Sequence, residues 1–107
     1  MTRGSSDFRV QALLSIQRAL WDAVTPDLRA VTLRVQEPAI IGRFLYQNPP
    51  GCEQREIVSE VESYVIADFD KTVSVSFVAY HLPLGVSRDL REGEEWVFMR
   101  REEEVSG

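Results

Sequence analysis

Apolar residues recur at spacings of three and four near the start of the chain, which is the period of an amphipathic helix. Asp7 can cap this helix, and Pro26 ends it because a proline ring disfavours helical geometry in the residue before it. We predict a helix over about residues 7–24, with Trp21 among the residues that face the core. The apolar series is Val10, Leu13, Leu14, Leu20, Trp21 and Val24, and Gln11, Ser15, Arg18 and Asp22 form the wet face.

The period then changes to two, which is typical of half-buried strands. From Leu28 onward Val31, Leu33 and Val35 alternate with polar residues until Glu37-Pro38 breaks the run. A second run over residues 40–47 carries aromatic residues two positions apart and ends at a proline-rich and glycine-containing turn. The two runs predict a β-hairpin.

The second half of the chain has the same order of elements. Helical spacing returns from Glu53 to about Phe69, strict alternation over residues 73–80 predicts a third strand, and residues 96–99 predict a short fourth one. We expect the tail from Glu102 to Gly107 to fray. On the second helix the residues expected to face inward are Ile57, Val58, Val61, Tyr64 and Val65.

These elements predict an α+β fold in the order α-β-β-α-β-β, with a four-stranded, mainly antiparallel sheet and two helices covering one face. A length of 107 residues is the usual size of one domain, so we expect a single domain over residues 1–107 with an ordered core at about 7–101. Hydrophobic residues make up 44% of the chain and charged residues 27%, which is ordinary globular usage and predicts that the chain folds unaided.

Net charge and hydropathy limit the kinds of partner that the protein is expected to bind. The net charge of -5 disfavours nucleic acid, whose affinity comes mainly from Lys and Arg on phosphates, and favours a basic protein. Apolar runs such as residues 39–41 are far shorter than the roughly 20 residues that cross a bilayer, so we expect no membrane span. The first residues lack the apolar stretch of a secretory signal, so a cytoplasmic location is expected.

The residues that carry chemistry are few. Cys52 and His81 are the only cysteine and histidine, and a nucleophile and base formed from them would lack a third orienting group. No set of His, Cys and carboxylates has metal-ligand spacing, and the glycines do not bunch into a phosphate-binding loop. We therefore predict no catalytic residue, no metal site and no cofactor.

The distribution of acidic residues is the one sequence feature that suggests a function. One group lies on the second helix and the other in the last loop, and either could steer the protein onto a basic partner or could only solubilise the surface. The residues predicted to bind a partner are Glu53, Glu56 and Glu60 on the helix and Asp89, Glu92, Glu94 and Glu95 in the loop.

Three stretches carry a family resemblance: Thr25 to Val31, the helix segment Ser59 to Phe69, and the ending Trp96 to Glu102. Together they resemble a family of short bacterial α/β proteins, mostly uncharacterised, that includes immunity proteins of contact-dependent growth inhibition and related polymorphic toxin systems. Relatives usually carry an acidic residue after the hairpin aromatic, whereas Tyr46 is followed here by Gln47. The resemblance implies a protein that binds and neutralises a toxin, and it transfers no functional residue.

Three function classes follow. The first is a cytoplasmic, non-catalytic immunity protein whose partner is a cognate toxin, expected to be basic. The second is a small enzyme or ligand-binding domain with Cys52 or His81 in a pocket between helices and sheet. The third is a homo-oligomeric structural protein, in the simplest case a homodimer, that pairs sheet edges or the uncovered sheet face.

Overall fold

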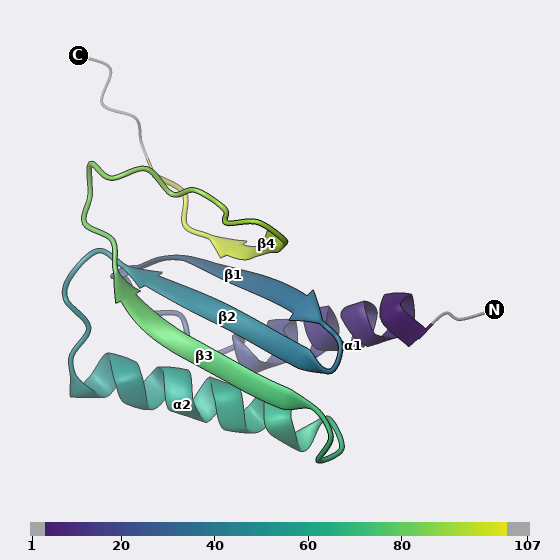
Figure 1. Cartoon of the computed structure of the whole chain (residues 1–107). Coiled ribbons are helices and arrows are strands. Elements are labelled where there is room, and N and C mark those ends of the chain that lie inside the picture. The colour runs from purple at the N-terminus through teal and green to yellow at the C-terminus, as the bar shows by residue number, and fades with distance from the viewer. Residues whose placement is uncertain (1–3, 103–107) are drawn as a thin grey trace.

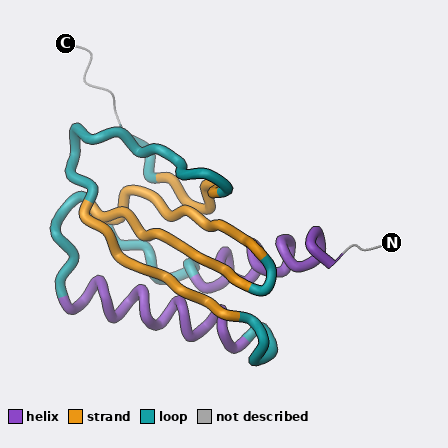
Figure 2. Tube along the Cα trace, in the orientation of Figure 1, coloured by secondary structure: helices purple, strands orange, loops and turns teal. Residues whose placement is uncertain are grey.

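The computed structural model describes the backbone of residues 4–102 and the side chains of residues 7–102. The predicted order of two helices and four strands is confirmed (Figure 1, Figure 2). The elements are α1 (Gly4–Ala19), β1 (Leu28–Gln36), β2 (Ala39–Tyr46), α2 (Cys52–Ala67), β3 (Ser74–His81) and β4 (Glu94–Met99).

The sheet has the strand order β3-β2-β1-β4 and is mixed, so the prediction of a mainly antiparallel sheet was wrong. β1 pairs antiparallel with both β2 and β4, but β2 pairs parallel with β3. The reason lies in the connection: α2 carries the chain along the sheet from the end of β2 to the start of β3, and such a crossover lays the next strand parallel to the previous one. The strand patterns alone did not show this.

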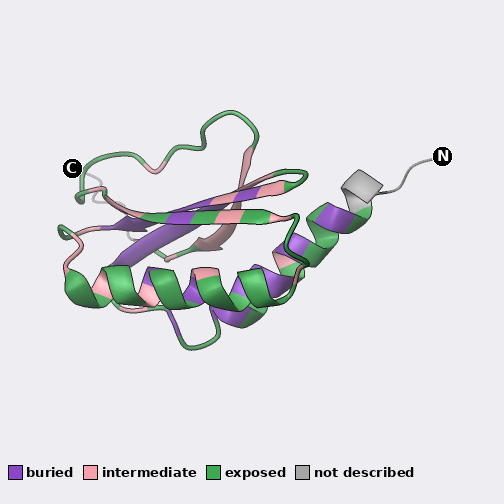
Figure 3. Ribbon diagram, turned by 60° about the horizontal axis from the view of Figure 1, so that its bottom comes forward, coloured by how far each residue is buried: buried purple, intermediate pink, exposed green. Residues whose placement is uncertain are grey.

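Both helices pack against the same face of the sheet (Figure 1, Figure 3). The core between them takes alternate residues of the strands, such as Val31, Leu33 and Phe44, because successive side chains of a strand point to opposite faces. From α2 it takes Val58, Val61 and Val65, which were predicted to face inward, whereas Tyr64 was also predicted there and is 46% exposed.

The face that α1 turns to the core agrees only in part with the predicted one: Leu20 is buried as predicted, but Ser15, predicted on the wet face, is buried too. The buried series is Phe8, Ala12, Ser15, Ile16 and Ala19, while Val10, Leu14 and Trp21 are exposed. Both the predicted and the observed series have helical spacing. The small side chains of Ala12 and Ala19 allow α1 to pack closely against the core, which favours the observed buried face. Ser15 is buried without penalty because its hydroxyl donates a 2.6 Å hydrogen bond to Asp68 on α2's end.

The helix begins at Gly4 and ends at Ala19, both earlier than predicted, so Asp7 lies in its first turn instead of capping it. Residues 20–23 form tight turns, in which the amide of Ala23 donates to the carbonyl of Leu20 at 3.1 Å. These turns carry Trp21 out of the helical register and away from the core, where its exposed fraction is 90%.

The loop between β3 and β4, residues 82–93, crosses the face of the sheet that the helices leave open. Arg29 of β1 anchors it, because its Nη1 donates 2.9 Å hydrogen bonds to the carbonyls of Leu82, Pro83 and Val86. Gly93 ends the loop at a φ of 80°, a conformation that side chains with a Cβ rarely adopt. The expected uncovered sheet face is therefore covered in part by this loop.

Candidate partner-binding surfaces

Glu94, one of the four loop acids predicted to contact a partner, turns its side chain into the protein. Its side chain is 6% exposed, and both carboxylate oxygens accept hydrogen bonds from Arg43 of β2, at 2.7 Å from Nε and 2.6 Å from Nη2. Thr32 and the amide of Arg91 also donate to it. The expectation that Glu94 is an exposed charge was wrong, because the β1–β4 register places it opposite Arg34 on the same sheet face as Arg43.

Burial alone would raise the pKa of Glu94, but these hydrogen bonds outweigh burial and lower the pKa from 4.5 to about 2. The carboxylate is therefore ionised throughout the physiological range. Its charge is neutralised within the fold by Arg43 and contributes little to an outward field.

The remaining loop acids differ among themselves. Glu95 forms a bidentate pair with Arg9 of α1, with oxygen to nitrogen distances of 2.6 and 2.9 Å. Asp89 and Glu92 are exposed, and no ion pair joins either of them to another described residue. Of the loop set, these two carboxylates remain available to a partner.

The tail beyond β4 is more ordered at its start than the sequence predicted. Glu102 pairs with Arg29, Arg88 and Arg100 at 2.8, 3.4 and 2.8 Å. The hydrogen bonds from Arg29 are the largest cause that lowers the pKa of Glu102 from 4.5 to about 2. The prediction of a frayed tail was therefore wrong for Glu102, and residues 103–107 lie outside the described residues.

The acidic residues of α2 divide into two groups. Glu53, Glu56 and Glu60 are exposed, as predicted, and lie at spacings of three and four on one side of the helix. Glu62 instead points to the sheet edge, where its Oε2 accepts a 2.8 Å hydrogen bond from the amide of Phe77. Whether the exposed three contact a partner stays a prediction.

A groove lies between the end of α1 and the middle of α2, and we call it the α1–α2 groove. Its space is about 180 Å³. It is lined by Ala19, Asp22, Ala23, Ile57, Glu60, Val61 and Tyr64. Trp21, the most exposed of the large hydrophobic residues, directly precedes Asp22. This surface was missed from the sequence because Trp21 and Tyr64 fitted the inward positions of their helical series.

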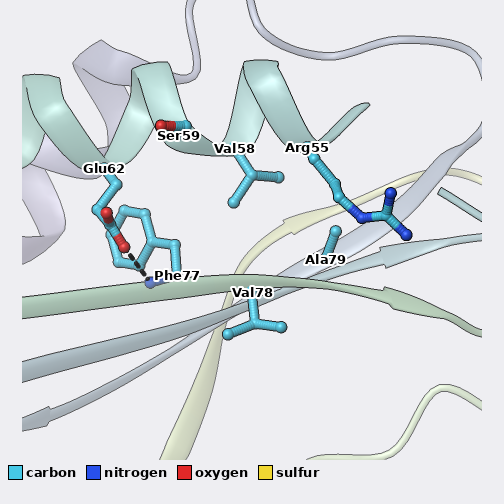
Figure 4. A pocket seen from close by; sticks show the side chains of 7 residues that line it. All are labelled: Arg55, Val58, Ser59, Glu62, Phe77, Val78 and Ala79. Carbon is cyan, nitrogen blue, oxygen red and sulfur yellow. Dashed lines mark hydrogen bonds between the residues drawn. The ribbon is translucent and has the colours of Figure 1, made fainter. Parts of the chain in front are cut away.

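The small-enzyme alternative needs a pocket between helices and sheet, and one lies at the edge of the sheet, between α2 and β3 (Figure 4). Its lining is Arg55, Val58, Ser59, Glu62, Phe77, Val78 and Ala79. Neither Cys52, which is exposed at the first residue of α2, nor His81, exposed at the last residue of β3, is among these. The structure therefore does not bring the two candidate catalytic residues into this pocket.

Within residues 4–102, no three His, Cys, Asp or Glu side chains gather closely enough to hold a metal ion. Over the same range, neither helix has the length and hydropathy needed to cross a membrane.

Comparison with known protein families gives a match over most of the chain. Residues 9–102 match the family model described as MafI2 immunity protein. No curated protein matches the sequence. The match begins within α1 and includes α2 and the whole sheet, so it covers most of the fold rather than one motif.

Proposed function

The chain belongs to the MafI2 immunity protein family, and from that premise we propose that it binds a cognate toxin and neutralises it without catalysis. Family membership is the observation that carries this proposal. An immunity protein acts by occupying its toxin stoichiometrically, so it needs a complementary surface and no reactive group.

The distribution of charge supports a basic partner. Six arginines, Arg9, Arg18, Arg29, Arg43, Arg88 and Arg100, pair with carboxylates of the protein itself. The surplus of 17 acidic over 12 basic residues is therefore displayed mainly by exposed carboxylates such as Glu56 and Glu92. A negative surface of this kind speeds encounter with a positive one.

The proposed place of action is the cytoplasm. There the protein would meet a toxin that is delivered into the cell or that the cell itself has synthesised. The small-enzyme alternative gains no support, because Cys52 and His81 lie outside the α2–β3 pocket.

The test is co-expression of this protein with the toxin domain encoded beside its gene. We expect growth to be rescued and the two proteins to elute as one complex of fixed stoichiometry in size-exclusion chromatography with light scattering. A catalytically impaired toxin keeps the complex assay possible in the absence of rescue. Loss of growth together with separate elution of the two proteins would refute the proposal.

A further inference from the structure

The size and floor of the α1–α2 groove suit a single amino-acid side chain. Its volume of about 180 Å³ lies below the roughly 300–1,000 Å³ of pockets that hold small-molecule ligands. Ala19, Ala23 and Val61 line it and are at most 7% exposed, so they form an apolar floor beneath the opening. An aliphatic side chain that packs on this floor would be removed from contact with water.

Two carboxylates from different elements line the same groove. Asp22 follows the end of α1 and Glu60 lies in the middle of α2, and within the described part of the chain neither has an ion-pair partner. Arg18, the basic residue in the last turn of α1, is held by Asp68 at 3.2 Å instead. The groove therefore holds two carboxylates whose charge no cation among the described residues neutralises.

One exposed aromatic residue lines the groove and another directly precedes one of its carboxylates in the chain. Trp21 is 90% exposed and Tyr64, in the groove lining, is 46% exposed. A tryptophan displayed in this way is unusual, since the residue is highly buried on average and is enriched among the residues that dominate binding energy in interfaces. Aromatic faces also attract cations.

We propose that the α1–α2 groove receives a lysine or arginine side chain of the cognate toxin. The aliphatic stem lies on the apolar floor, the cationic head lies between Asp22 and Glu60, and Trp21 packs against the surrounding toxin surface. This inference rests on the proposed function and assigns the docking site within it. Glu53 and Glu56, further toward the start of α2, extend the negative surface from the groove.

A second hollow provides a matched control. Beside the start of α1, Asp7 and Glu37 line a space of about 280 Å³ together with Phe8 and Phe69. Both carboxylates are exposed, as in the groove, but Phe8 is 7% exposed and Phe69 is half-buried. Asp70 also lines this hollow and accepts hydrogen bonds from Thr72, so the hollow has three carboxylates and no exposed aromatic side chain.

The experiment measures binding kinetics against the toxin domain encoded beside the gene. Asp22→Asn/Glu60→Gln and Asp7→Asn/Glu37→Gln each remove two negative charges, so long-range steering decreases by a similar amount in both. We expect the dissociation rate to rise about tenfold or more only for the groove pair. Trp21→Ala should weaken binding about 30-fold, the range of a residue that dominates an interface.

Thermal melts of the three variants check that each is folded. Trp21, Asp22, Glu60 and Glu37 are exposed enough that their substitution should leave the melt unchanged, whereas Asp7 lies in the first turn of α1, where loss of its charge costs about 0.3–1 kcal/mol and leaves the protein folded. Equal dissociation rates for the groove pair and the control pair, with the wild type still neutralising the toxin, would overturn the docking site and leave the function intact. A wild type that neither binds nor neutralises overturns both. Dimerisation of the protein alone, abolished by Trp21→Ala, would assign the groove to a second copy and also overturn the inference.

Discussion

The guanidinium of Arg43 on β2 donates two hydrogen bonds, of 2.7 and 2.6 Å, to the carboxylate of Glu94 at the start of β4. These bonds reach across the intervening strand β1. Thr32 of β1 donates to the same carboxylate at 3.1 Å. The pair thus links three strands on the face that carries the β3–β4 loop, and Arg43 also donates to the carbonyl of Asp89 in that loop. Glu94, which the sequence analysis predicted to contact a partner, instead stabilises the fold.

Replacing Glu94 by glutamine should destabilise the protein strongly. The side chain of Arg43 is 10% exposed, and removal of its carboxylate leaves a largely buried cation uncompensated. Breaking one half of such a pair costs about 3–5 kcal/mol. Chemical denaturation of Glu94→Gln measures this loss in the free energy of unfolding.

Glu92→Gln is the matched control, because Glu92 is exposed two positions away and its substitution should change stability by no more than about 0.5 kcal/mol. Replacing both partners, as Arg43→Met/Glu94→Leu, should recover part of the loss, because an apolar pair leaves no unpaired charge. Similar stabilities for Glu94→Gln and Glu92→Gln would contradict the assigned role of the pair.

Stability should fall in acid between about pH 4.5 and pH 2. Glu94 and Glu102 have pKa values lowered in the folded protein to about 2, so the folded state binds fewer protons than the unfolded state in this window. Their contribution is complete above the ordinary pKa of 4.5 and is lost as the pH falls through the folded value. Each carboxylate contributes at most on the order of 3 kcal/mol.

The measurement is the free energy of unfolding as a function of pH for the wild type and Glu94→Gln. The variant should lose less stability than the wild type over the same window, since one of the carboxylates whose pKa is lowered in the folded protein is gone. Parallel curves for the two proteins would mean that Glu94 does not titrate with a lowered pKa.

Tyr46→Phe should be neutral or stabilising, although Tyr46 is fully buried. Its hydroxyl finds no hydrogen-bond partner among the described residues, and burial, with a smaller effect of Asp27, raises its pKa to about 12. Removing an unsatisfied buried hydroxyl while keeping the ring removes a desolvation penalty of about 1–3 kcal/mol at most. A thermal melt of Tyr46→Phe that falls by several degrees would show that the hydroxyl has a partner in solution.

The elements were predictable because each of them obeys one local period. The alternation over β3 puts Phe77 and Val78 on opposite faces of the sheet, and in the structure Phe77 is buried and Val78 is exposed. Strand direction was not predictable in this way. The parallel pairing of β2 with β3 follows from the path of α2, and the hydrophobic pattern of the strands does not depend on their direction. In α1 two apolar series compete, and only contact with the sheet and α2 selects the one with Ala12 and Ile16.

The candidate surfaces were predictable only in part. Glu56 and Glu60 are exposed because helical spacing places them opposite Val58 and Val65, which the sequence shows. Glu94 could not be distinguished from Glu92 in the same way, because the β1–β4 register brings one of them to Arg43 and leaves the other in water. The exposure of Trp21 depends on the early end of α1, which no residue before Pro26 marks.

The structure changes how the negative surfaces should be tested against a basic toxin. Reversing Glu94 to lysine would place a cation against Arg43 and unfold the protein, so a loss of binding would say nothing of an interface. Two pairs of exposed acids avoid this problem: Asp89 and Glu92 in the loop, and Glu53 and Glu56 on α2. Reversing either pair to lysine changes the net charge by the same amount.

Because Glu53 and Glu56 lie on the helix that carries Glu60 of the groove, we expect Glu53→Lys/Glu56→Lys to slow association about tenfold or more at low salt, and Asp89→Lys/Glu92→Lys to slow it less. Near 1 M salt the screening length shrinks to about 3 Å, so the two rates should converge. Stopped-flow association at both salt concentrations, with a thermal melt of each variant, measures this. Equal slowing by the two pairs at low salt would mean that only net charge steers the encounter. A larger effect of Asp89→Lys/Glu92→Lys would move the interface to the β3–β4 loop, on the opposite face of the sheet from the helices, because local steering requires the reversed charges to face the incoming partner.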